Sequence, residues 1–204
     1  MKCLPTLFAA LVLLPVTVFG QDSTAKGNAT PFRKGQWAAQ FQAGTAFGSL
    51  GFIKFRSPTR ALVLDLGIAG SHSETMVTDS SGTRFGALHS TAFTEVRFGW
   101  RRYSADGTVA KIVSHYSFGA LAGFQHDVAA ARGGSSQTNG WTAGVFGDVG
   151  GTYLLTSRFG IGALATATIY YRNAVSKSSF DIASRNWTIG GSALSAALVA
   201  TVYF

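Results

Sequence analysis

The last eleven residues of the chain alternate between two sets of side chains. Residues 194–204 read LSAALVATVYF, so Leu198 and Phe204 fall on one face of an extended strand and Ser195 and Thr201 on the other. Termini of soluble sheet proteins tend to fray into water, which makes an exposed final Phe unusual there. A transmembrane strand can end on an aromatic ring at the membrane interface. This ending therefore favours a membrane-spanning strand.

The first twenty residues have the pattern of a secretory signal peptide. Lys2 precedes an apolar stretch over residues 4–19, and polar character begins at Gln21. The stretch is shorter than the roughly 20 apolar residues of a transmembrane helix. We expect a signal peptide over 1–20, a short periplasmic lead-in over 21–34 and a barrel over 35–204. Cys3 would leave with the signal peptide, so no disulfide or thiolate-bound metal is expected.

The composition argues against an ordinary soluble domain. The chain is 47% hydrophobic, contains 16 Phe and 25 Gly, and has only 13% charged residues, whereas soluble domains carry about a quarter. Apolar surface without a long apolar helix is what alternating membrane strands produce. The net charge of +8 favours either a solvated basic surface or contact with anionic lipid and lipopolysaccharide. No basic run with interleaved aromatic residues indicates nucleic acid.

Two-residue periodicity recurs in eight segments, followed alternately by short and by mostly long, polar links. The segments cover residues 36–45, 49–56, 61–71, 87–103, 111–125, 141–155, 159–172 and 187–204, and the long links cover 71–86, 128–140 and 173–186. Long extracellular links and short periplasmic ones are typical of membrane barrels. We therefore expect an all-β protein, an eight-stranded antiparallel transmembrane up-and-down β-barrel.

Aromatic residues fall near both ends of these segments and predict two interfacial girdles. The girdle near the periplasmic ends comprises Trp37, Trp100, Tyr103, Tyr153 and Phe204, and the one near the outer ends comprises Trp141, Tyr171 and Trp187.

The leader, the eight segments, the unequal links and the terminal Val202-Tyr203-Phe204 together resemble small outer-membrane barrels of the OmpA and OmpX type. The resemblance covers essentially the whole mature chain. It implies a monomeric protein of the bacterial outer membrane. It also implies that Val202, Tyr203 and Phe204 form the signal read by the barrel-assembly machinery. No motif identifies a subfamily.

Eight charged residues are assigned to the lumen by their place in the alternation. A charge facing lipid near the midplane costs up to several kcal/mol, and an eight-stranded lumen is just wide enough to be filled by side chains. Buried charges need partners, so we expect a packed network anchored by Glu95 and Arg97, or alternatively a narrow base-lined path for anions. The eight residues are Lys54, Arg56, Asp65, Glu95, Arg97, Arg101, Asp148 and Arg172.

One histidine–serine pair invites comparison with an enzyme. His115-Tyr116-Ser117 resembles the His-x-Ser part of the lipid A 3-O-deacylase pattern, but Phe118 stands where that family has Asn, and no Glu follows Glu95. A general base must reach its nucleophile and be oriented by a third group. We therefore expect no catalytic residue, cofactor or metal site, with lipid A modification as a minor alternative.

The long links are the expected site of function. They contain Arg84, Arg132, Lys177 and Arg185, which either contact lipopolysaccharide phosphates or simply meet water. The leading hypothesis is a structural or surface-interaction role with a side-chain-filled lumen and an extracellular partner of unknown identity. An anion channel is the main alternative. A soluble lipocalin-like barrel is the alternative fold, and charged inner faces fit it poorly.

Overall fold

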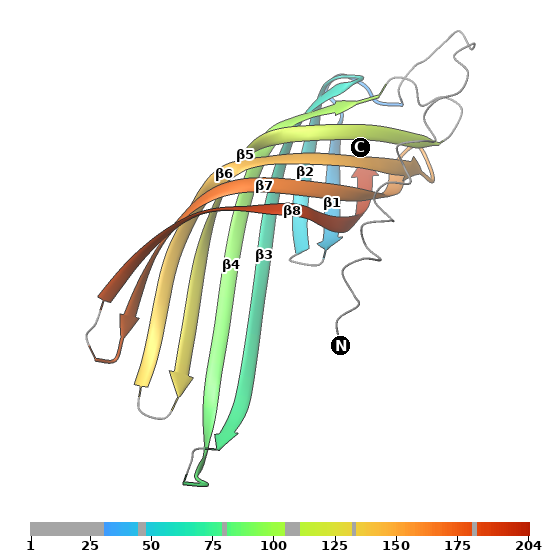
Figure 1. Ribbon diagram of the computed structural model, residues 1–204. Coiled ribbons are helices and arrows are strands. Elements are labelled where there is room, and N and C mark those ends of the chain that lie inside the picture. Colours follow the sequence, from blue (N-terminus) through green and yellow to red (C-terminus); the bar gives the residue numbers. More distant parts are fainter. Residues whose placement is uncertain (1–30, 45–47, 79–80, 105–110, 132–133, 181–182) are drawn as a thin grey trace.

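Eight antiparallel strands close into a barrel in the order of the sequence, with β8 paired back onto β1 (Figure 1). The computed structural model describes residues 31–44, 48–78, 81–104, 111–131, 134–180 and 183–204. The expected eight-stranded fold is confirmed, whereas the expected signal peptide and most of the lead-in lie outside the described residues. The strands are β1 (Trp37–Gly44), β2 (Gly48–Ser57), β3 (Arg60–Thr78), β4 (Arg84–Tyr103), β5 (Ile112–Ala131), β6 (Gly134–Leu154), β7 (Phe159–Ser178) and β8 (Ala183–Tyr203).

The described residues contain no helix long and apolar enough to cross a membrane.

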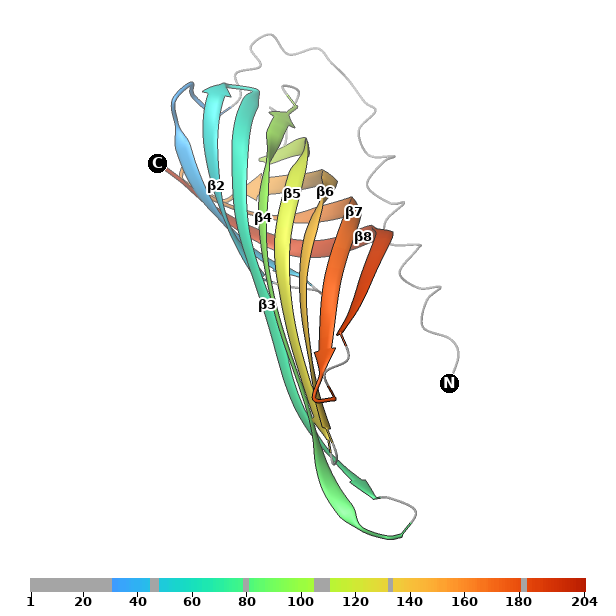
Figure 2. The same ribbon diagram turned by 90° about the vertical axis from the view of Figure 1, so that its left-hand side faces the viewer.

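The two ends of the barrel differ in the length of their strands. One end, which we call the turn end, holds the short connections β2–β3 and β6–β7 and the last strand residue, Tyr203. The opposite end, which holds the β1–β2 and β3–β4 connections, is called the hairpin end. At the hairpin end, β1 and β2 stop after 8 and 10 residues, whereas β3 to β8 run for 19 to 21. About 9 to 11 residues suffice to cross a bilayer. The six longer strands therefore continue as a curved sheet past the β1–β2 hairpin (Figures 1 and 2).

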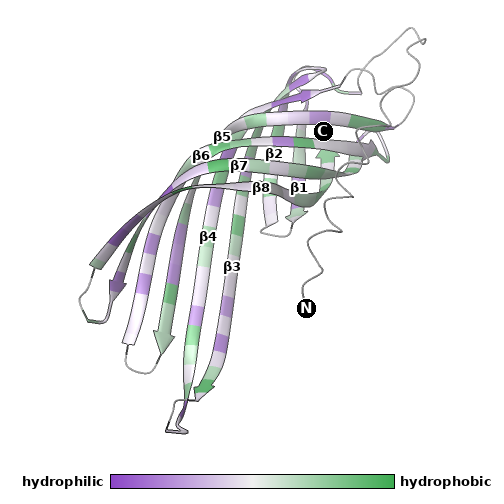
Figure 3. Cartoon of the chain, in the orientation of Figure 1, coloured by the Kyte–Doolittle hydropathy of each residue, from purple (hydrophilic) through white to green (hydrophobic). Residues whose placement is uncertain are grey.

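The three long polar links predicted from the sequence are mostly strand. Pairing continues from Ser71 to Thr78 in β3, to Ala131 in β5 and to Ser178 in β7. The prediction of long loops over 71–86, 128–140 and 173–186 was therefore wrong. In β3 and β7 both faces of these extensions carry polar side chains, so the alternation of hydrophobicity ends while backbone pairing goes on. Figure 3 shows hydrophilic residues along this part of the strands.

The outer surface of the barrel carries a belt of exposed apolar side chains. In β4, Val96, Phe98 and Trp100 are exposed, while Glu95 and Arg97 on the opposite face are buried. The same alternation recurs in the other strands, and it is the reverse of a water-soluble barrel. Exposed members of the belt include Phe41, Leu66, Phe118, Phe124, Val145, Val149, Ile161, Ile169 and Leu198.

Candidate functional site

Four aromatic rings fill the lumen at the turn end, and we call them the aromatic stopper: Phe32, Phe55, Tyr103 and Tyr203. The ring centroid of Phe32 lies 4.5 Å from that of Phe55, 4.8 Å from that of Tyr103 and 5.2 Å from that of Tyr203. All four rings are buried, Phe32 to 4% exposure. Residues from the lead-in, β2, β4 and β8 therefore pack together at this end of the barrel.

A tight turn folds the lead-in back so that Phe32 enters the lumen. Gly35 has φ of 86°, in the left-handed region that glycine tolerates best. Its N–H donates to the carbonyl oxygen of Phe55 at 2.8 Å, and the N–H of Phe55 donates to the carbonyl oxygen of Gln36 at 2.9 Å. These bonds extend the pairing of the lead-in with β2. Periodicity did not reveal Phe32, because it precedes the first strand.

A polar layer built around Arg101 lies next to the stopper. The Nε of Arg101 donates to Ser117 Oγ at 2.8 Å, and its Nη1 donates to Gln40 Oε1 at 2.6 Å. Along the same register row, Ser117 pairs with Asp148 and Asp148 with Thr166, and the Thr166 hydroxyl donates to Asp148 Oδ1 at 2.7 Å. The row spans β4 to β7 and places the buried base Arg101 two strands away from the buried acid Asp148.

A second polar layer holds the ion pair expected from the sequence. Arg97 Nε contacts Glu95 Oε1, with both side chains buried. The Arg97 guanidinium also lies 5.6 Å from the centroid of the Phe146 ring. A Cβ atom at Gly99 or Gly119 would come within 3.0 or 2.9 Å of that ring. Glycine on two neighbouring strands thus makes room for Phe146 to fill the lumen.

Asp65 completes the charged interior. Its Oδ1 accepts a hydrogen bond from Gln42 Nε2 at 3.3 Å. Gly51, the register partner of Asp65, leaves the space that the carboxylate occupies, because a Cβ there would collide with Oδ1. Asp65 and Asp148 both lie near enough to Arg101 for their charges to interact.

Replacing Glu95 with alanine is expected to lower the free energy of unfolding by about 2 kcal/mol, because Arg97 loses a charge-assisted hydrogen bond in a buried site. Urea titration of the folded barrel in detergent measures the midpoint. Glu74→Ala is the matched control, since Glu74 is exposed in β3 and its removal should leave the midpoint unchanged. An unchanged midpoint for Glu95→Ala as well would remove Glu95 from this role.

Lys54 and Arg56 do not belong to the lumen network, contrary to the sequence-based assignment. Ile53 and Phe55 of β2 are buried inside, so the residues between and after them face outward. Lys54 Nζ lies 4.7 Å from the centroid of the Trp37 ring on the outer surface. The assignment failed because the lumen at the turn end is apolar and aromatic, so the less polar face of β2 points inward. Arg172 faces the inner side, with its guanidinium 5.5 Å from the Tyr170 ring.

Tyr103 is likewise not a girdle residue, because it is 3% exposed and belongs to the stopper. It shares the inward face of β4 with Arg101. The other predicted girdle residues are exposed: Trp37, Trp100, Tyr153, Phe204, Trp141, Tyr171 and Trp187. Of the predicted assembly signal, Tyr203 is buried in the stopper and Phe204 is exposed; recognition of Val202, Tyr203 and Phe204 by assembly machinery stays a prediction.

His115 and Ser117 lie in the lumen near the turn end. The His115 ring packs against Tyr103 with centroids 5.5 Å apart, and neither ring nitrogen bonds to another side chain in the described part of the protein. Ser117 Oγ accepts from Arg101. The serine hydroxyl is thus engaged by a cation and not by the histidine.

Some solved protein structures share this architecture. No protein-family model and no curated protein matches the sequence. Among solved structures, the chain is similar to the outer membrane protein OprG from Pseudomonas aeruginosa, with a TM-score of 0.58 and 10% identity over 85% of this chain and 98% of that chain. It is also similar to a major outer membrane protein from Thermus thermophilus, with a TM-score of 0.55 and 12% identity over 83% of this chain and 98% of that chain.

The chain has the fold of a small outer-membrane β-barrel. The outer-membrane location expected from the sequence agrees with this fold. In such barrels the short turns face the periplasm and the long hairpins face outward. The turn end is therefore the periplasmic side of the barrel, and the hairpin end is its extracellular side.

The basic residues predicted to meet lipopolysaccharide lie near the hairpin end. Arg84 begins β4, Lys177 lies near the end of β7, and Arg185 lies near the start of β8. All three are exposed. Arg132, the fourth, lies outside the described residues.

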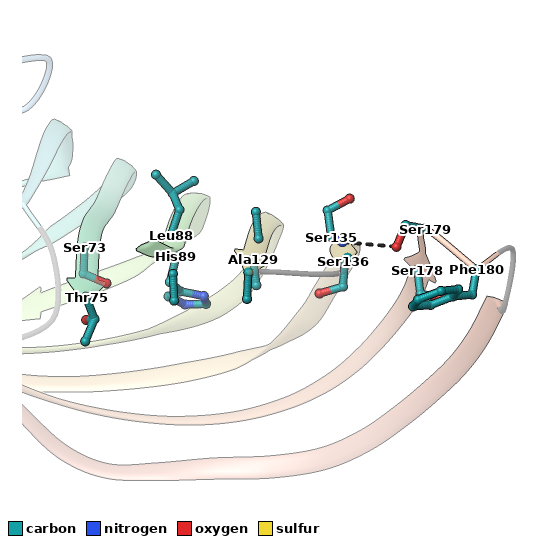
Figure 4. Close-up of a pocket in the computed structure, with 14 residues that line it drawn as sticks. Ser73, Thr75, Leu88, His89, Ala129, Ser135, Ser136, Ser178, Ser179 and Phe180 are labelled. Carbon is teal, nitrogen blue, oxygen red and sulfur yellow. Dashed lines mark hydrogen bonds between the residues drawn. The ribbon is translucent and has the colours of Figure 1, made fainter. Parts of the chain in front are cut away.

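The concave face of the sheet at the hairpin end holds a hollow of about 460 Å³. Small and hydroxyl side chains line much of it, with Phe180 at one edge (Figure 4). Ser73 and His89 are register partners there, and His89 Nε2 bonds to the Thr91 hydroxyl at 3.2 Å. The Ser135 N–H donates to Ser179 Oγ at 3.2 Å, which ties β6 to the end of β7.

Proposed function

We propose that the barrel works at the cell surface, with its lumen closed by side chains, and that the outer face of β7 and β8 contacts lipopolysaccharide. Closure is supported by the aromatic stopper, the Arg101 layer and the Glu95–Arg97 layer, which follow one another along the lumen. The proposal assigns no catalytic role to His115 and Ser117.

The order of side chains on the β7–β8 face carries the proposal. Trp187 and Ile189 on β8 are 67% and 71% exposed. On the same face, Arg185 lies two residues further toward the hairpin end than Trp187 and pairs with Val175 of β7. Lys177 of β7, which pairs with Ala183 of β8, follows it on this face. An apolar section followed by two bases matches a lipid whose acyl chains end in phosphorylated sugars.

Lipopolysaccharide binding should fall at least tenfold in the double variant Lys177→Ala/Arg185→Ala, because each base near an anionic surface contributes about 1 kcal/mol. The folded barrel is titrated with lipopolysaccharide in detergent. Lys111→Ala/Arg158→Ala is the matched control, since it removes the same charge from two exposed bases at the turn end. Equal binding by the wild type and the Lys177/Arg185 variant would refute the contact.

Closure of the lumen has a separate test, which is conductance of the refolded protein in a planar bilayer. A folded protein, verified by its mobility on an unheated gel, is expected to give no discrete current steps. Steady anion-selective current would instead favour the alternative of a channel lined by Arg97, Arg101 and Arg172.

A further inference from the structure

Three arginines on neighbouring strands face outward at the turn end. Arg56 of β2, Arg60 of β3 and Arg102 of β4 are all exposed. Arg60 and Arg102 are register partners, and Arg60 also pairs with Ser57, the residue that follows Arg56. We call these three residues the arginine triplet.

A row formed by Lys54 and three apolar residues, Leu62, Trp100 and Phe118, borders the triplet on the side toward the hairpin end. The next outward-facing position toward the hairpin end is occupied by Lys54 on β2, Leu62 on β3, Trp100 on β4 and Phe118 on β5. These four residues are register partners in that order. Trp100 and Phe118 are exposed, with their ring centroids 5.9 Å apart. The triplet therefore lies at the level where lipid headgroups follow the acyl chains.

Among the residues that the structure describes, no ion pair joins the triplet to a carboxylate. The acidic side chains of these residues are Asp65, Glu95 and Asp148, which are buried in the lumen, and Glu74 and Asp127, which lie in the halves of β3 and β5 toward the hairpin end.

Like charges directly opposite one another on a sheet destabilise it, and Arg60 and Arg102 form such a pair. Other cations of the turn end, Arg33, Lys34, Lys111 and Arg158, are also exposed. This concentration of positive charge favours an anion as the ligand of the triplet. Guanidinium groups bind phosphate oxygens with two parallel hydrogen bonds, which favours a phosphate ligand.

We propose that the arginine triplet binds the phosphate headgroup of an anionic phospholipid of the periplasmic leaflet, while its acyl chains lie on Leu62, Trp100 and Phe118. The positive charge of the arginines favours this occupant, and so does their position directly beside Leu62 and Trp100 on the same outer face. The bound lipid would relieve the repulsion between Arg60 and Arg102. This inference concerns the opposite end of the barrel from the lipopolysaccharide contact and is independent of it.

The test measures lipid preference of the full-length folded protein in phosphatidylcholine vesicles. Spin-labelled phosphatidylglycerol and phosphatidylcholine report which lipid occupies the protein surface. The wild type is expected to prefer phosphatidylglycerol several-fold, and Arg56→Gln/Arg60→Gln/Arg102→Gln is expected to lose most of that preference. Because both leaflets contain the same lipids, the result does not depend on the orientation of insertion.

The matched control is Lys34→Gln/Lys111→Gln/Arg158→Gln, which removes the same formal charge from exposed bases of the turn end outside the triplet. A loss in the triplet variant that is clearly larger than in the control supports the proposal. An equal loss in both would reflect net charge alone and overturn it, as would an unchanged preference. Loss of the wild-type preference on adding inorganic phosphate would assign the triplet to the free ion, which also overturns it. Should the Gln variant not refold, Arg→Lys at the three positions is expected to keep only part of the preference, and full retention would contradict phosphate recognition by guanidinium groups.

Discussion

Arg101→Ala is expected to lower the free energy of unfolding by about 3–5 kcal/mol, the usual cost of removing one partner from a buried charged cluster. The Arg101 side chain is buried and hydrogen-bonded to Ser117 and Gln40. Its removal takes away a positive charge that acts on the carboxylates of both Asp65 and Asp148. Urea titration of the folded protein in detergent, followed by tryptophan fluorescence and gel mobility, measures the change.

Arg102→Ala is the matched control for this variant. Arg102 is the next residue in β4, has the same chemistry and faces outward, so its removal should shift the midpoint by less than about 0.5 kcal/mol. Arg101→Lys is expected to fall between, since a lysine keeps the charge but not the two-sided donor geometry. A stability of Arg101→Ala equal to that of Arg102→Ala would mean that the charged layer adds nothing to the barrel.

The side of the sheet on which a residue lies could be predicted where hydrophobicity alternates strongly. In β4, the exposed Val96 and Trp100 and the buried Glu95 and Arg101 follow the sequence pattern. In β2 the same logic inverted the faces, because Ile53 and Phe55 are apolar residues of the lumen. The lumen changes from aromatic at the turn end to polar further along. A single rule that the polar face points inward therefore fails where the lining is itself apolar.

The ends of the strands were harder to predict than their number. The segment ending at Ser71 continues to Thr78, and the one ending at Arg172 continues to Ser178. Beyond the apolar belt, neither face is selected for hydrophobicity, yet the backbone still gains from pairing with the neighbouring strand. Pattern-based reading locates the membrane-facing part of a strand and not its full length.

The partners inside the lumen depend on register, which alternation alone does not provide. The row that joins Arg101, Ser117, Asp148 and Thr166 unites four strands, and the space for Phe146 depends on Gly99 and Gly119 of two other strands. The residue types were visible in the sequence, but their juxtaposition was not. Only the Glu95–Arg97 pair, two residues apart on one strand, could be proposed from local spacing.

Phe32→Ala is expected to lower the free energy of unfolding by about 3 kcal/mol, since it empties a buried aromatic site. The Phe32 ring contacts three others at centroid distances of 4.5 to 5.2 Å. It comes from the lead-in, so the substitution leaves every strand and every register pair unaltered. Phe180→Ala is the control, because Phe180 is 73% exposed at the hairpin end. The free energies of unfolding of the two variants, measured by thermal and urea unfolding, should differ by nearly the full value of about 3 kcal/mol.

Conductance separates the stabilising role of Phe32 from closure of the lumen. Beyond the stopper, the lumen is still filled by Arg101 with its partners and by the Glu95–Arg97 pair beside Phe146. Barriers in series block ions as long as one remains, so Phe32→Ala is expected to be less stable yet as silent as the wild type in a planar bilayer. Current through a folded Phe32→Ala barrel would show that the polar layers are permeable and that the stopper alone closes the wild-type lumen. Silence together with lost stability would place closure in the charged layers, where Arg97 and Arg101 already have hydrogen-bonded partners.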